Sequence, residues 1–138
     1  MLPMSEMKTA THTPIKILSI LLLLFGVFAF VGSMFLWGEG FILSFPEGVD
    51  YSFPVADILI NAPASIIAAI GLWRLKRYGY VVSQFVAVFY IYASVEIFVQ
   101  VAQAGPPYPM EIIGPQVIAV IVAIFLIFYL WHVKDLFQ

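Results

Sequence analysis

The sequence contains no cysteine, and only 10% of its residues are charged. The absence of cysteine excludes disulfides, thiolate metal sites, thiol nucleophiles and palmitoylation. No cluster of basic and aromatic residues is present, so nucleic-acid binding has no support. Hydrophobic residues make up 63% of the chain, far above the roughly 45–50% that is usual in soluble domains. We therefore expect lipid to be the solvent for most of the chain.

The chain also lacks the short motifs on which many enzymes and metalloproteins depend. It has no phosphate-binding glycine loop, no zinc-type spacing of histidine and glutamate, and no Cys-x-x-Cys pair. Its two histidines, His12 and His132, both fall on the predicted inner side, away from any outer serine, so acyl transfer has no support. We expect no cofactor and no metal. An enzyme is the function class that the sequence favours least.

Four stretches of the chain are apolar enough, and approximately long enough, to cross a bilayer. A helix needs about 20 apolar residues to cross a hydrocarbon core of roughly 30 Å. The second stretch is the shortest and carries Asp57, Asn61 and Pro63. We predict an all-α integral membrane protein, a four-transmembrane-helix antiparallel bundle. Its single membrane domain covers 15–138 after a cytoplasmic N-terminal tail at 1–14, with spans at about 15–37, 56–73, 80–103 and 112–133.

The basic residues are confined to one side of this predicted bundle. The two connections on the other side contain no lysine or arginine and carry acidic residues instead. Because cytoplasmic loops of membrane proteins are rich in lysine and arginine, we predict that both termini are cytoplasmic. We expect the membrane to be a prokaryotic cell membrane. The six basic residues are Lys8, Lys16, Arg74, Lys76, Arg77 and Lys134.

The connections add two further expectations. In the first outer loop, the aromatic runs "FILSF" and "DYSF" flank the turn-forming "PEGV", which is typical of a short β-hairpin. An irregular interfacial loop is the alternative. The endings "LWRLK" at 72–76 and "LWHVK" at 130–134 repeat one another. This repeat indicates either a duplicated two-helix unit or simply the tryptophan belt and inner positive charge of any membrane protein.

Polar residues recur along the third span at intervals of three and four. Phe85, Phe89, Tyr92, Glu96, Gln100 and Gln103 fall within a helical stripe about 80° wide. Ser83, Ala87, Tyr90 and Ser94 lie on another side and are typical of a packing seam. Intramembrane ionisable residues are functional candidates by default. We predict a ligand or ion pocket in the outer half of the bundle, with these candidate residues: Asp57, Asn61, Tyr92, Glu96, Gln100, Gln103 and Gln116.

Three functional interpretations follow. The preferred one is a small membrane binding module, or an accessory subunit, with its polar pocket in the outer half. The first alternative is a proton- or cation-coupled transporter or channel that acts as an oligomer, because the inner half lacks a matching polar path. The second alternative is a membrane enzyme acting on a lipid-borne substrate. The expected partners are the lipid bilayer and either a second copy of the chain or a larger membrane complex, without nucleic acid.

Overall fold

The structure, a computed structural model, describes residues 4–38, 55–108 and 110–138. Within these ranges the chain is helical and contains no strand. The predicted β-hairpin falls on 39–54 and lies outside the described residues. The helices are α1 (Met4–Gly38), a π-helical turn η1 (Asp57–Asn61) that leads into α4 (Ala62–Trp73), α5 (Arg77–Ala104) and α6 (Met110–His132), followed by the 3-10 turn η2 (Lys134–Leu136).

Three of the helices are long and apolar enough to cross a membrane. These stretches are His12–Phe35, Arg77–Gln103 and Ile113–His132. The predicted second span forms a shorter apolar helix, Asp57–Trp73, built from five π-helical and twelve α-helical residues. Helix α1 begins at Met4, so helical structure extends through most of the segment predicted as a tail. The fold is therefore a helical bundle with four segments close to the predicted positions.

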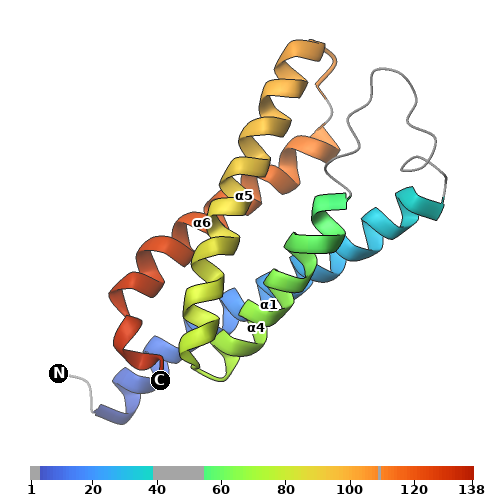
Figure 1. The fold of residues 1–138 in the computed structure, drawn as a ribbon. Coiled ribbons are helices and arrows are strands. Elements are labelled where there is room, and N and C mark those ends of the chain that lie inside the picture. The colour runs from blue at the N-terminus through green and yellow to red at the C-terminus, as the bar shows by residue number, and fades with distance from the viewer. Residues whose placement is uncertain (1–3, 39–54, 109) are drawn as a thin grey trace.

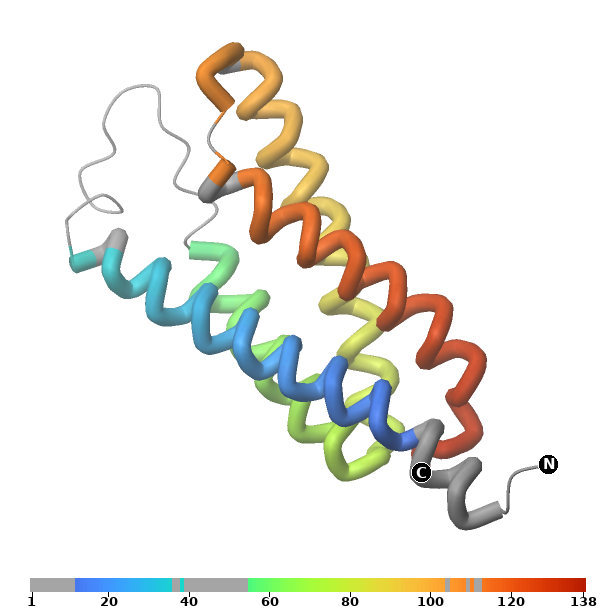
Figure 2. Tube along the Cα trace, turned by 180° about the vertical axis from the view of Figure 1, so that it is seen from behind, coloured from blue at the N-terminus to red at the C-terminus, as the bar shows by residue number. Residues whose placement is uncertain are grey.

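The helices form two packed pairs. Helix α1 packs along α4, α5 packs along α6, and the contact of α4 with α5 joins the pairs. The ends that hold the start of α1, the α4–α5 turn and the end of α6 lie together (Figure 1). At the opposite end the pairs diverge, and α5 extends upward beyond η1, as the view from behind also shows (Figure 2).

The turn between α4 and α5 is tight enough to require glycine on both sides. A Cβ atom on Gly71 would lie 2.6 Å from Cε2 of Tyr78 and 2.7 Å from the backbone nitrogen of Gly79. Leu75 makes the reversal with a φ of 53°. Gln138 docks on this turn, because its N–H donates to the Leu75 carbonyl at 3.1 Å and its own carbonyl accepts the N–H of Arg77 at 3.0 Å. The predicted antiparallel neighbours are thus locked together at this end.

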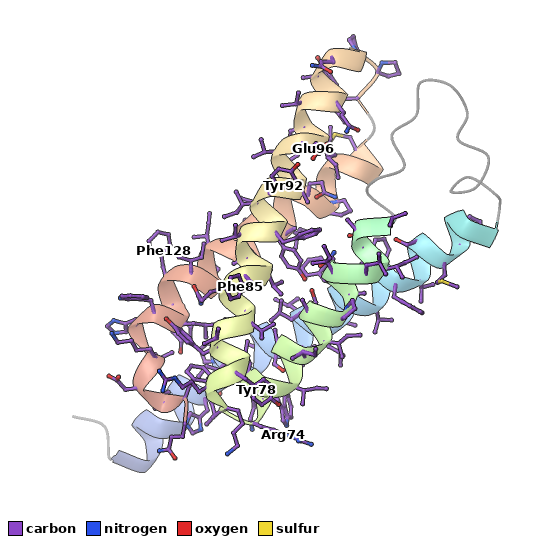
Figure 3. All side chains as sticks on the ribbon, viewed as in Figure 1. Arg74, Tyr78, Phe85, Tyr92, Glu96 and Phe128 are labelled. Carbon is purple, nitrogen blue, oxygen red and sulfur yellow. The ribbon has the colours of Figure 1, made fainter. Side chains whose placement is uncertain are left out.

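Every described basic side chain gathers at that same end. Lys16 lies over the ring of Trp73 at 5.4 Å, and Lys134 lies over Trp131 at 4.8 Å. Arg74 and Tyr78 mark the α4–α5 turn in Figure 3. The two repeated endings, 72–76 and 130–134, thus lie at the same end of the bundle. Helix α4 ends within the first, at Trp73, and α6 ends within the second, at His132.

The core of this end is apolar and densely packed. Its fully buried side chains come from all four helices and are mostly leucine and alanine, as buried positions favour. They hold the helices together at the end that carries the basic residues, and Asp57 and Asn61 lie toward the opposite end. The core members include Leu22, Ala68, Leu72, Val86, Ala87, Leu126 and Leu130.

Candidate functional site

The second segment begins, at its end away from the basic residues, with a π-helical turn that lies directly before Pro63. Proline has no N–H, so it cannot donate to the carbonyl one turn earlier. The backbone just before it adopts the wider register, and the N–H of Ala62 donates to the carbonyl of Asp57. Single π-helical turns are frequent at functional sites. The turn Asp57–Asn61 carries the two candidate site residues of the second segment, the carboxyl group of Asp57 and the amide of Asn61.

A row of side-chain hydrogen bonds starts at this turn and runs into the bundle. Asn61 Nδ2 donates to Asp57 Oδ1 at 2.8 Å, and Ser65 Oγ donates to Asn61 Oδ1 at 3.0 Å. The hydroxyl of Ser65 also meets the phenol oxygen of Tyr90, on α5, at 2.9 Å. Because residues four apart share one helix face, the three residues of the second segment stack in line toward Tyr90. We call Asp57, Asn61, Ser65 and Tyr90 the polar row.

The directions of the bonds in the polar row follow from the orientation of the Asn61 amide. Asn61 presents its NH2 group to Asp57 and its oxygen to Ser65, and this orientation suits a carboxylate oxygen that accepts. Ser65 has one hydroxyl proton, which this amide oxygen takes. In the contact between Ser65 and Tyr90 the phenol therefore has to be the donor. All the donors point the same way, from the buried tyrosine toward the outer carboxylate.

The inner part of the polar row is sealed from outside by close packing of α1. Ser65 is 0% exposed and Tyr90 is 4% exposed. A Cβ atom on Gly26 would lie 3.1 Å from Ser65 Cβ and 3.2 Å from the carbonyl oxygen of Ala62, so glycine lets α1 approach this closely. The ring of Phe25 meets the Tyr90 ring edge-on, with centroids 5.6 Å apart. Buried polar groups need partners, and the row supplies them.

A second polar contact joins α5 to α6 one turn further out. Ser94 Oγ donates to Gln116, with the side-chain Oε1 at 3.1 Å and the backbone oxygen at 3.3 Å. Ser94 follows Tyr90 by four residues and lies on the same buried side of α5. The predicted packing seam is confirmed, because all four of its members, Ser83, Ala87, Tyr90 and Ser94, are buried.

The predicted stripe of α5 lies mostly on the exposed side of the helix, although Phe89 packs against the core. Tyr92 is 65% exposed, Gln100 and Gln103 are exposed, and Glu96 is half-buried. Figure 3 places Tyr92 and Glu96 on the upper half of α5, above Phe85. In the described part of the chain no hydrogen bond joins Glu96 to Asp57. The reason is that one helix cannot turn both of its stripes inward, and the small seam is the one that packs.

The structure thus divides the sequence candidates among three groups. Asp57 and Asn61 belong to the polar row, and Gln116 is bonded to Ser94. Tyr92, Glu96, Gln100 and Gln103 form a separate outward stripe on α5. Sequence reasoning missed Ser65 and Tyr90 as members of the site. The available signal was the spacing of four between Asp57, Asn61 and Ser65, which places a hydroxyl directly behind the amide.

The polar row ends at Tyr90 and does not continue toward the basic end. The nearest hydroxyls in that direction bond to local carbonyls: Ser19 donates to Ala69 at 2.6 Å, and Ser83 donates to Tyr80 at 2.7 Å. The space between them is filled by the apolar core. The described residues therefore provide a polar row in the half of the bundle away from the basic end, and an apolar core in the half that holds the basic residues.

The chemistry of the site has to be interpreted from its own residues. Comparisons with protein-family models, with curated proteins and with solved structures gave no match. Among the described residues, no group of three or more histidine, aspartate and glutamate side chains is placed to hold a metal ion. What the site offers is one carboxylate, oriented by an amide, at an end of the molecule where the described chain has no cation.

Proposed function

We propose that the protein is an integral membrane binding module whose four helices span the bilayer, with both termini cytoplasmic. Its outer half binds a small monovalent cation or an ammonium group at Asp57. The membrane setting is supported by the three long apolar helices, and the orientation by the basic residues at one end. The second segment is short, and its outer end carries Asp57 about 24 Å from Trp73 by a rise of 1.5 Å per residue.

The observation that carries the proposal is the direction of the polar row. Three donors in succession point toward Asp57, and its Oδ1 accepts the bond of Asn61 at 2.8 Å. The hydrogen bond from Asn61 favours the charged form of Asp57, which lies at a half-buried position. Every described basic side chain lies at the other end of the bundle. A carboxylate held in this way and lacking an internal counter-ion is suited to an external cation.

Binding accounts for the structure better than transport by a single chain. The polar row stops at Tyr90, and the core below it is apolar. Inward of Tyr90, the polar side chains Ser19, Ser83 and Gln84 each donate to a backbone carbonyl, so the described residues offer a cation no continuous polar path. The transporter or channel alternative therefore requires an oligomer, and the accessory-subunit and enzyme alternatives have no feature of their own in the described structure.

The proposal is tested by cation-dependent stability of the purified protein in mild detergent. Thermal unfolding is followed in sodium, potassium and methylammonium chloride at equal ionic strength. A cation at one hundred times its Kd stabilises the native state by about 2.7 kcal/mol. We expect one cation to raise the unfolding temperature by several degrees, and Asp57→Asn to abolish that rise.

Asp135→Asn is the matched control, because it removes the same charge from an exposed carboxylate at the opposite end of the molecule. It should leave the cation response unchanged. Equal responses of the wild type and Asp57→Asn, or no difference among the three salts, would overturn the proposal.

A further inference from the structure

Lys16 and Trp73 meet on an exposed surface of the α1–α4 pair, at the basic end of the bundle. The amine of Lys16 lies 5.4 Å from the centroid of the Trp73 ring, and both side chains are exposed. Arg74 follows Trp73 directly and is exposed as well (Figure 3). An indole ring at a helix end favours the headgroup level of a membrane. The Lys16 amine therefore lies at that level too.

These cations have no acidic partner among the described side chains. No ion pair joins Lys16 or Arg74 to a described carboxylate, and Asp135 is the one described acidic side chain at the basic end. Glu6 lies ten residues before Lys16 on the same helix, about 15 Å away by the helical rise. The positive charge of Lys16 and Arg74 is thus left for an external anion.

The rest of the chain does not reach this position. Helix α1 is continuous from Met4, which lies about 18 Å from Lys16 by the helical rise. The three residues before Met4 span at most about 11 Å when fully extended. Residues 39–54 connect helix ends at the opposite end of the bundle, where Gly38 lies about 33 Å from Lys16. The surface around Lys16 is therefore open to a partner from outside the chain.

Exposed apolar side chains continue from Lys16 and Trp73 along both helices. On α1 they follow Lys16 at intervals of four, and on α4 they precede Trp73 at intervals of three, spacings that keep residues on one helix face. Because Lys16 lies over Trp73, the two faces belong to the same side of the α1–α4 pair. These residues form an apolar strip that runs about 12 Å from Lys16 toward the opposite end. They are Ile20, Leu24, Ile67 and Ile70.

This surface matches the two parts of a phospholipid. Cations at the headgroup level attract a lipid phosphate, and the apolar strip offers contact to an acyl chain further into the membrane. No described carboxylate pairs with Lys16 or Arg74, so the surface has no counterpart for the ammonium group of a zwitterionic lipid. A lipid with a net negative charge is therefore favoured over a neutral one.

We propose that an anionic phospholipid binds at this surface, with its phosphate held by Lys16 and Arg74 beside Trp73 and one acyl chain along the apolar strip. Such binding depends on the membrane setting of the proposed function but not on cation binding at Asp57. Each basic residue near a membrane surface strengthens the binding of an anionic lipid about fivefold. Removal of either cation should weaken the binding by about this factor.

Quenching of Trp73 fluorescence by brominated lipid measures this binding. A reporter variant keeps Trp73 and carries Trp37→Phe and Trp131→Phe, which removes the other two tryptophans. Flotation with phosphatidylcholine vesicles first establishes that the reporter inserts. Brominated phosphatidylglycerol and brominated phosphatidylcholine are then compared at equal mole fractions in these vesicles. We expect a binding constant at least about fivefold higher for phosphatidylglycerol.

Charge variants of the reporter identify the residues that hold the phosphate. Lys16→Gln and Arg74→Gln should each lower the preference for phosphatidylglycerol about fivefold, whereas Lys16→Arg keeps the charge and should preserve it. Lys134→Gln is the matched control, because its amine lies 4.8 Å from the ring centroid of a tryptophan on another helix. It should leave the preference unchanged. All three native side chains are exposed, and circular dichroism checks that helicity is retained.

Three results would overturn the proposal. One is equal quenching by the two lipids. Another is a loss of preference in Lys134→Gln as large as in Lys16→Gln, which would indicate only the general attraction of a basic surface. The third is relief of the quenching by glycerol phosphate, which would assign Lys16 and Arg74 to a soluble phosphate compound.

Failure of this proposal is distinguishable from failure of the proposed function. Asp57→Asn should keep the full preference for phosphatidylglycerol, so loss of the cation response leaves the lipid site intact. A reporter that does not float with the vesicles would contradict the membrane setting, and with it both proposals.

Discussion

The hydrogen bond between Ser65 and Tyr90 should be energetically coupled across two helices. Ser65→Ala keeps the Cβ atom and removes the hydroxyl that serves both neighbours. Tyr90 then loses its acceptor and Asn61 loses its donor, in a region where Ser65 is fully buried. An unsatisfied buried polar group costs about 1–3 kcal/mol. We expect Ser65→Ala to lower the free energy of unfolding by about 2–3 kcal/mol.

Tyr90→Phe should cost less, because Ser65 still donates to Asn61 after the phenol is removed. A loss of about 1 kcal/mol is expected for one net hydrogen bond. The double variant has no phenol left without an acceptor. Its loss in free energy of unfolding should therefore be smaller, by about 1 kcal/mol, than the sum of the losses of the two single variants. The free energies are measured by equilibrium unfolding with SDS in mild micelles, followed by tryptophan fluorescence.

Ser83→Ala supplies the matched control for this cycle. Ser83 is as fully buried as Ser65, but its hydroxyl donates to the Tyr80 carbonyl on its own helix. Its effect should add to that of Tyr90→Phe without coupling. Additive losses for Ser65→Ala and Tyr90→Phe would refute the assignment of a continuous polar row.

Two further predictions concern the packing and the orientation. Gly71→Ala should lower the free energy of unfolding by about 3 kcal/mol, because the new Cβ atom would collide with the backbone of Gly79. Gly32→Ala is the control and should not lower this free energy, because nothing lies within 4 Å of its Cβ position. Denaturant unfolding of both variants measures the difference. A fluorescent protein fused after Gln138 should be fluorescent in the cytoplasm, and alkaline phosphatase fused there should be inactive. Active phosphatase would contradict the predicted orientation.

The sequence was sufficient to predict the helices because their signals are long and local. Apolar length predicted all four segments, and the basic residues predicted which helix ends lie together. The seam Ser83, Ala87, Tyr90 and Ser94 was also predictable, since small residues at helical spacing allow close approach. The antiparallel contact of the second and third segments agrees with the predicted antiparallel bundle.

The candidate site could be predicted only in part, because its partners are brought together by packing. Asp57 and Asn61 were expected from their polarity in an apolar stretch. Ser65 gave no such signal, and its role depends on Gly26, which lets α1 seal it, and on Tyr90 from another helix. The outward direction of Glu96 was unpredictable for the same reason. Periodicity defines two stripes on a helix but not which of them faces the bundle.

The polar row also connects the half-buried Asp57 to the positions of hydroxyl hydrogens deep in the bundle, on Ser65 and Tyr90. The orientations of the Asn61 amide, the Ser65 hydroxyl and the Tyr90 phenol form one series of hydrogen bonds that ends on the Asp57 carboxyl group. Ser65 lies about 12 Å inward of Asp57 by the helical rise. A cation or proton that binds Asp57 therefore changes the acceptor on which the hydrogen-bond orientation of the Tyr90 hydroxyl depends. The bonds of Asn61 and Ser65 thus connect Asp57 to a tyrosine on another helix.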